Sequence, residues 1–113
     1  MQYLLLIYAN ETGWSRLSPA EQEQGVSSYR EFREAMTKAS VLKGANRLQP
    51  TSNATTIRVV DGRSQVIDGP FAETKEQLGG YYLIDAPNLD AAISWAARCP
   101  GASHGAVEIR PLW

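Results

Sequence analysis

The order of apolar and polar positions along the chain predicts six strands and two helices. The first strand, Gln2–Ala9, is apolar at nearly every position, which is typical of a strand covered on both faces. A long helix is predicted from Ser18 to about Ala39. It begins with Ser18-Pro19-Ala20-Glu21, which supplies an N-cap, a first-turn proline and the acidic residue of a capping box. Its apolar positions then advance by three or four, at Val26, Tyr29, Phe32, Met36 and Ala39.

The middle of the chain predicts a short strand followed by a β-hairpin. The short strand is Ala45–Leu48. Ala54–Val60 is rich in β-branched residues, Asp61-Gly62 is a tight-turn signal, and Ser64–Asp68 forms the returning strand. The next Asp-Gly pair is followed by Pro70, which ends this strand because proline cannot donate to the ladder.

The last third predicts a strand, a helix and a final strand. The strand is Leu78–Asp85, and Asn88 then caps a helix that ends at Arg98. Ala106–Arg110 forms the last strand. The apolar face of this helix is predicted to consist of Leu89, Ala92, Ile93 and Ala96.

This order of elements predicts an α+β fold, a ferredoxin-like split βαβ protomer with an inserted β-hairpin. Both helices of such a fold cover the same face of the sheet. The strands carry apolar residues for two faces, so the second face needs a cover, and a second copy of the sheet is the natural one. We therefore expect a homodimer.

Length and charge narrow the class of protein. The 113 residues suit one domain, residues 1–113. The formal net charge of −1 and the lack of a Lys/Arg cluster argue against direct nucleic-acid binding. The longest apolar run, Tyr3–Ala9, is too short to span a membrane, and no signal peptide precedes it, so we expect no membrane partner and a cytoplasmic location.

A motif near the end of the hairpin carries a family resemblance. Asp68-Gly69-Pro70-Phe71, with the run from Ala72 to Tyr82, resembles the DGPF-domain proteins, a branch of the YCII-related family. The opening Tyr3–Tyr8 and the closing Val107–Leu112 match as well. The resemblance implies that the ferredoxin-like protomers form a dimeric α/β barrel, in agreement with the homodimer expected from the sheet.

The resemblance says less about activity. Relatives in the wider group include a dehydrochlorinase acting on a chlorinated hydroxyquinol, and some DGPF proteins occur beside, or fused to, extracytoplasmic-function sigma factors. The wider group is associated with a His–Asp pair, the histidine on the first helix and the aspartate in an Asp-Pro step after the second. Here those positions fall near Ser27 or Ser28 and at Cys99-Pro100, so the pair is not carried over.

Two residues are candidates for acid–base catalysis. Asp68 ends a strand beside Gly69 and Pro70, where a pocket rim can hold a carboxylate as a general base; the alternative is a side chain that caps its own turn. His104 is the only histidine, and flanking glycines permit close approach by a ligand or another chain. Its alternative is an exposed loop residue.

Six further residues are candidates for substrate binding. Glu73 and Lys75 lie in a loop of alternating charges, which is either a grip on an anionic substrate or a solvated surface. Three aromatic side chains could line an apolar pocket, and because neighbours on a strand face opposite ways, only one of Tyr81 and Tyr82 can do so. Arg58 is either an anion clamp or a residue on the wet face of a strand. The aromatic candidates are Tyr8, Phe71 and Tyr81.

These residues support two hypotheses. The first is a protein that binds a small aromatic or anionic metabolite and performs acid–base chemistry on it, without a metal or other cofactor, since no metal-ligand spacing or phosphate-binding loop is present. The second is a non-catalytic ligand-sensing or interaction module associated with a sigma factor. Convergence of Asp68, Glu73, Lys75 and His104 on one pocket favours the first.

Overall fold

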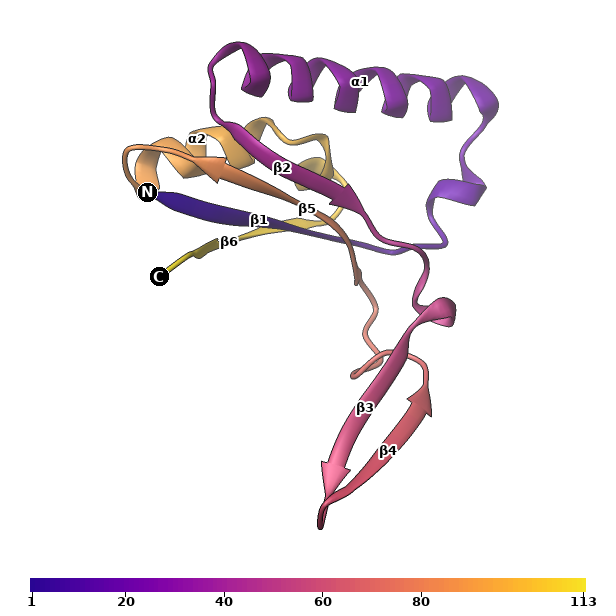
Figure 1. The fold of residues 1–113 in the computed structure, drawn as a ribbon. Coiled ribbons are helices and arrows are strands. Elements are labelled where there is room, and N and C mark those ends of the chain that lie inside the picture. The colour runs from indigo at the N-terminus through magenta and orange to yellow at the C-terminus, as the bar shows by residue number, and fades with distance from the viewer.

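The computed structural model describes residues 1–113 and shows an α+β fold with two helices on one face of an antiparallel sheet (Figure 1). The sheet has the strand order β2-β5-β1-β6, in which β5 lies between β1 and β2, as a split βαβ fold requires. The strands and helices are β1 (Gln2–Ala9), α1 (Pro19–Lys38), β2 (Leu42–Arg47), β3 (Thr55–Val60), β4 (Arg63–Asp68), β5 (Gln77–Asp85), α2 (Leu89–Arg98) and β6 (Ala106–Pro111). The predicted ferredoxin-like arrangement with an inserted hairpin is compatible with this topology.

Both helices begin at the residues that the sequence predicts. The Ser18 side chain accepts a hydrogen bond from the Glu21 backbone N–H, and the Glu21 carboxylate accepts one from the Ser18 backbone N–H, which completes the capping box. The Asn88 side chain accepts from the Ala91 backbone N–H at the start of α2. These local bonds fix where each helix enters the helical layer.

The core lies between the two helices and one face of the sheet. From the sheet it takes Tyr3 and Leu5 on β1 and Tyr82 and Ile84 on β5, which face α1 and α2. Phe32 of α1 meets Tyr82 edge to face, with the ring centroids 5.4 Å apart. These contacts hold the helices on the sheet.

Some apolar positions expected inside are exposed. The side chains close to half exposed are Val26, Leu89 and Ile93. In each helix, the row of residues that contacts the core is narrower than the apolar face predicted from the sequence. In α1 this row is Tyr29, Phe32 and Met36; in α2 it is Ala92 and Ala96 with their neighbours.

The opposite face of the sheet has no layer over it. Side chains alternate along a strand, so Leu4 and Leu6 point away from the core that buries Leu5. Leu83 is paired with Leu4 and Tyr81 with Leu6, which places all four on the same side. We call this surface the bare sheet face; its residues are Leu4, Leu6, Tyr8, Tyr81 and Leu83.

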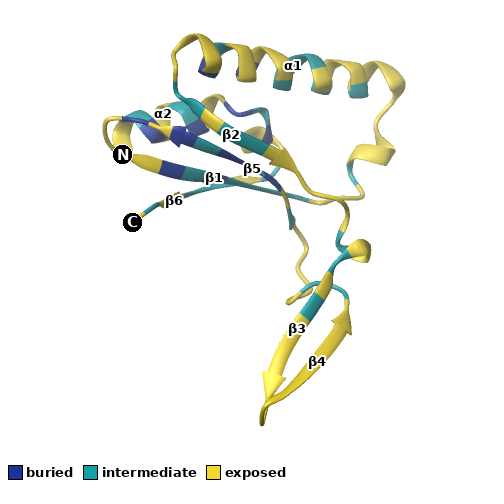
Figure 2. Ribbon diagram, viewed as in Figure 1, coloured by how far each residue is buried: buried dark blue, intermediate teal, exposed yellow.

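The inserted hairpin stands apart from the sheet. β3 and β4 pair only with each other, and Figure 1 shows them projecting away from the helices, on the side of the bare sheet face. Asp61 and Gly62 both have positive φ, 52° and 75°, as a tight hairpin turn requires. Figure 2 shows the hairpin almost wholly exposed. We call this hairpin, Thr55–Asp68, the arm.

Candidate functional site

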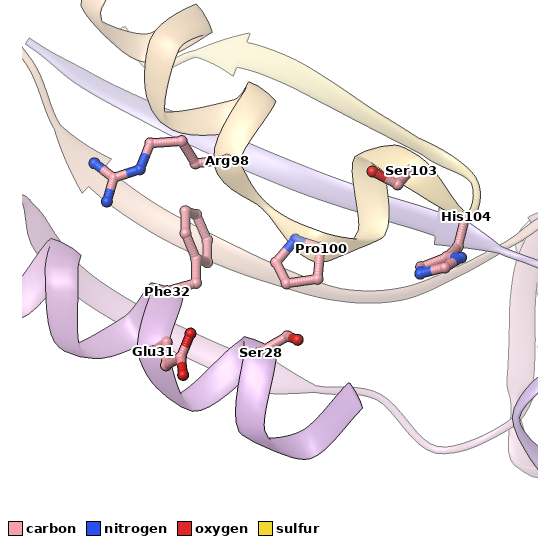
Figure 3. A pocket seen from close by; sticks show the side chains of 7 residues that line it. All are labelled: Ser28, Glu31, Phe32, Arg98, Pro100, Ser103 and His104. Carbon is pink, nitrogen blue, oxygen red and sulfur yellow. The ribbon is translucent and has the colours of Figure 1, made fainter. Parts of the chain in front are cut away.

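A cavity of about 430 Å³ opens where the end of α2 meets α1. Figure 3 shows Ser28, Glu31 and Phe32 on α1, facing residues at and after the end of α2. We call it the helix-end cavity. It is open to solvent and lined mostly by polar residues, and its volume falls in the range of small-molecule sites. The seven residues that line it are Ser28, Glu31, Phe32, Arg98, Pro100, Ser103 and His104.

The backbone after α2 places the histidine at this cavity. Pro100 follows the last helical turn, and the chain continues as a short 3-10 helix, Pro100–Ser103. The backbone N–H groups of His104 and Gly105 both donate to the carbonyl of Gly101, at 3.2 and 2.9 Å. These two bonds turn the chain back toward β6 with the imidazole at the cavity.

Gly105 lets this loop lie directly on β1. A Cβ atom on Gly105 would lie 2.0 Å from the carbonyl oxygen of Tyr8 and 3.0 Å from the Cα of Ala9. The flanking glycine was expected to admit a ligand or another chain; in the protomer the group that approaches Gly105 is instead the backbone of the chain's own first strand. This contact fixes the position of the histidine relative to the sheet.

The charged groups of the cavity are free to meet a ligand. The two ion pairs of the chain join Met1 to Asp85 and Glu108 to Arg110, so Arg98 and Glu31 take part in neither. The Arg98 guanidinium lies over the ring of Trp95, 4.5 Å from its centroid, which limits its orientations.

The His104 imidazole forms no hydrogen bond within the chain. Phe32 contributes a buried aromatic ring to the same cavity, whose other lining residues are mostly polar. An anion binds best where an unpaired guanidinium is preoriented. An imidazole can exchange a proton with such a ligand.

Buried groups beside the cavity do not titrate near neutral pH. Burial raises the pKa of the Cys99 thiol, and it also raises the pKa of the Tyr29 and Tyr82 hydroxyls. Cys99 is 1% exposed and packs near Tyr29 under the first turn after α2. The thiol therefore serves packing at the cavity wall and stays protonated.

The structure brings one of the predicted site residues, His104, to the cavity. Asp68 is the exposed last residue of β4, and Glu73 and Lys75 are exposed in the loop that follows. His104 is thus separated from the other three, and the four residues do not line one pocket in the protomer.

The other four candidates lie on two further surfaces. Tyr8 and Tyr81 belong to the bare sheet face, where the Tyr81 hydroxyl accepts from the Asn46 side chain at 2.9 Å. Tyr82 lies in the core, so the two adjacent tyrosines do face opposite sides. Arg58 and Phe71 meet at the arm, with the guanidinium 5.0 Å from the ring centroid.

The Asp-Gly-Pro-Phe segment forms the root of the arm. Gly69 has φ of +121°, a region that favours glycine. Its backbone N–H donates to Ala54 O, and its carbonyl accepts from the Thr56 hydroxyl, both at 2.8 Å. The motif thus ties the end of β4 to the start of β3.

Sequence reasoning missed four polar residues of the cavity. Ser28 and Glu31 fall on the wet side of the predicted helix, and Arg98 and Ser103 appear only as residues near a helix end. The usable signal was the resemblance, which locates its His–Asp pair near Ser27 or Ser28 and at Cys99-Pro100. Ser28 and Pro100 both line the cavity.

The chain has neither a metal-ligand cluster nor a helix that could cross a membrane. No group of three or more His, Cys, Asp or Glu side chains is arranged to hold a metal ion. Neither helix has the length and apolar character needed to cross a membrane.

Comparisons with known proteins cover the entire chain. A family model described as the YCII-related domain matches residues 1–113. An uncharacterized protein of Rhizobium meliloti (strain 1021) is 41% identical over 114 residues, which cover 99% of this chain and 92% of that relative. Both matches span the helix-end cavity and the arm.

Proposed function

The chain belongs to the YCII-related domain family, and we propose that it binds a small anionic metabolite in the helix-end cavity and exchanges a proton with it through His104. The observation that carries this proposal is that Arg98 and His104 both line one cavity of about 430 Å³, with the guanidinium and the imidazole at opposite ends of it (Figure 3). Arg98 is always cationic, and the His104 imidazole can donate or accept a hydrogen bond.

Each lining residue has a role that follows from its chemistry. Arg98 pairs with a carboxylate of the ligand, and the hydroxyls of Ser28 and Ser103 offer further hydrogen bonds. Phe32 packs against the apolar or aromatic part of the ligand. Glu31 accepts from a ligand hydroxyl or ammonium group, which selects against a ligand that is anionic at both ends.

The location of the cavity supports the same reading. The resemblance locates the group's histidine near Ser27 or Ser28 and its aspartate at Cys99-Pro100, and of these residues Ser28 and Pro100 line the cavity. Neither position carries an ionisable side chain at the cavity, since Cys99 is buried. His104 supplies an imidazole to the same cavity from the loop before β6.

We also propose that two protomers pack through the bare sheet face as a dimeric α/β barrel. The support is an excess of surface: the protomer exposes 8135 Å², whereas a compact protein of 12.4 kDa exposes about 6,100 Å². The excess of about 2,000 Å² per protomer is in the range that homodimers bury. Leu6→Lys places a charge on this face, and sedimentation equilibrium should show a monomer where the unmodified protein is a dimer.

Benzoate is a suitable probe of the helix-end cavity because it combines a carboxylate with an aromatic ring. In ¹H–¹⁵N spectra, benzoate should shift the amide signals of residues 28–32 and 98–104. Arg98→Gln should raise the Kd for benzoate at least tenfold, since a charge-assisted hydrogen bond is lost. Arg16→Gln, which changes an exposed arginine outside the cavity, should leave the Kd unchanged. Equal Kd values for the two variants would contradict the proposal.

Substitution of His104 tests its part in binding. His104→Ala should raise the Kd for benzoate, because the cavity loses an imidazole that can donate a hydrogen bond to the carboxylate. An unchanged Kd would exclude the imidazole as a ligand contact.

The roles predicted for the remaining seven candidates stay predictions. Asp68, Glu73 and Lys75 lie at or beyond the root of the arm, outside the helix-end cavity of their own protomer. Substituting each with its neutral counterpart and repeating the benzoate titration tests whether any of them reaches a bound ligand.

A further inference from the structure

One face of the arm is made of exposed apolar side chains. Ile57 is paired with Val66, and Val59 lies one step further toward the turn on the same side. These three side chains are 64%, 65% and 66% exposed. The other face is more polar and carries Arg58, whose guanidinium covers the ring of Phe71.

Such an arm is poorly stabilised by its own contacts. A single two-stranded hairpin is at best marginally stable in water, and an exposed row of β-branched side chains favours association with another chain. Gly69 ties the root of the arm, but the apolar pair Ile57 and Val66 lies beyond that tie. The exposed apolar face of the arm would therefore be stabilised by packing against another surface.

The position and length of the arm identify a second copy as that cover. The arm projects to the side of the bare sheet face (Figure 1), where the proposed dimer places the partner protomer. Packed sheets lie about 10 Å apart, and six-residue strands reach about 20 Å. An arm of this length is long enough to reach past the plane of a partner sheet packed on the bare sheet face.

The overall dimensions of the protomer show that it is less compact than a typical domain of its length. Its radius of gyration is 16.1 Å, whereas a compact domain of this length has about 13 Å. The whole chain, with the arm included, extends 48, 40 and 18 Å along its three principal axes, and Figure 1 shows the arm projecting from the body of helices and sheet. A second copy that fills the angle between body and arm would cover both apolar surfaces at once.

We propose that the arm is an exchange arm, which packs the apolar face of Ile57, Val59 and Val66 against the second copy of the chain. This inference rests on the proposed dimer and adds a second contact to it. Each protomer then holds its partner in two places, through the sheet and through the arm, and the Asp-Gly-Pro-Phe segment at the root sets the direction of the arm.

Two matched double variants test the arm separately from the sheet. Ile57→Thr with Val66→Thr removes apolar side chains from the proposed contact face, and threonine keeps the β-branched shape that favours strands. Val60→Thr with Ile67→Thr makes the same chemical change on the opposite face. Sedimentation equilibrium measures the Kd of the dimer for both.

The proposal expects the Ile57→Thr/Val66→Thr dimer to dissociate with a Kd at least tenfold above that of the unmodified protein, and above that of the control variant. Equal Kd values for the two variants, with the dimer intact, would contradict the proposed arm contact but not the proposed dimer through the bare sheet face. An unmodified protein that is monomeric at 100 µM would overturn both, and would indicate a different protein as the cover of the arm.

Hydrogen exchange on the unmodified protein provides a second measurement that needs no substitution. Backbone amides of residues 55–68 should be protected in the dimer and should lose that protection on dilution to the monomer. Amides that exchange in the dimer as fast as in the monomer would overturn the proposal. Neither result depends on ligand binding, so the helix-end cavity is judged by the benzoate titration alone.

Discussion

Replacing Gly105 with alanine tests whether contact with β1 holds the loop that carries His104. The added Cβ would lie 2.0 Å from Tyr8 O, far inside the distance that real Cβ contacts reach, and the obstructing atom is backbone. The loop must therefore move away by about 1 Å or more. Overpacking of this kind costs about 3 kcal/mol when neighbours cannot relax. We expect Gly105→Ala to lower the free energy of unfolding by about that amount.

The matched control is Gly79→Ala. Its added Cβ would meet nothing closer than Ile7 O at 3.9 Å, an ordinary contact, so the two variants share the effect of alanine on the unfolded chain and differ in the clash. Urea denaturation gives the free energies, and ¹H–¹⁵N spectra report whether residues 98–104 have moved. If Gly105→Ala is as stable as Gly79→Ala and its spectrum is unchanged around His104, the close-contact argument is wrong.

Three further predictions concern the core and the helix caps. The free energy of unfolding should fall as the pH rises above about 8.5, because the pKa values of Cys99, Tyr29 and Tyr82 are raised in the folded state and the unfolded chain loses these protons at lower pH. Each group contributes a loss of up to about 1.4 kcal/mol per pH unit. Urea denaturation at pH 7.5 and at pH 10.5 measures this loss. Stability that does not change between these pH values would contradict the buried placement. Met36→Ala should cost about 3 kcal/mol in the same assay, since Met36 is 0% exposed in the core. Asn88→Ala should cost about 1 kcal/mol through the lost N-cap of α2, and a neutral result would exclude that cap as a stabilising contact.

The elements that follow local rules could be predicted closely from the sequence. The capping box at Ser18, the Asn88 cap and the Asp61-Gly62 turn each depend on bonds within a few residues, and the structure has all three. The β1 strand has the predicted bounds, Gln2–Ala9. Local bonding thus determines where both helices begin and where the hairpin turns. The short strand was predicted less well: β2 is Leu42–Arg47 and not Ala45–Leu48, because its bounds depend on pairing with the distant β5.

Which side chains are exposed and which residues form the helix-end cavity depend on contacts between distant segments, and these were predicted less well from the sequence. The C-terminal backbone docks on β1 through Leu112 N–H to Gln2 O, but the Trp113 indole extends into solvent, which its apolar character alone does not predict. The helix-end cavity joins α1 to residues some seventy positions later, so no spacing along the chain shows that Glu31 and Arg98 share it. The charged loop with Glu73 and Lys75 looked like a site because its charges are adjacent in sequence.

The arm shows a third limit. Its alternating β-branched pattern predicts the hairpin correctly, because pairing across a tight turn is local. The same pattern cannot say what covers Ile57 and Val66, since that surface is not among their neighbours in sequence. Only the direction in which the arm projects supplies that information.

A crystal structure of the protein with bound benzoate is the most direct test of the central claim. The account predicts electron density for benzoate in the helix-end cavity, with the carboxylate within hydrogen-bond distance of the Arg98 guanidinium and the ring against Phe32. Benzoate bound at another surface, with the cavity of Arg98 and His104 filled by ordered water alone, would contradict it.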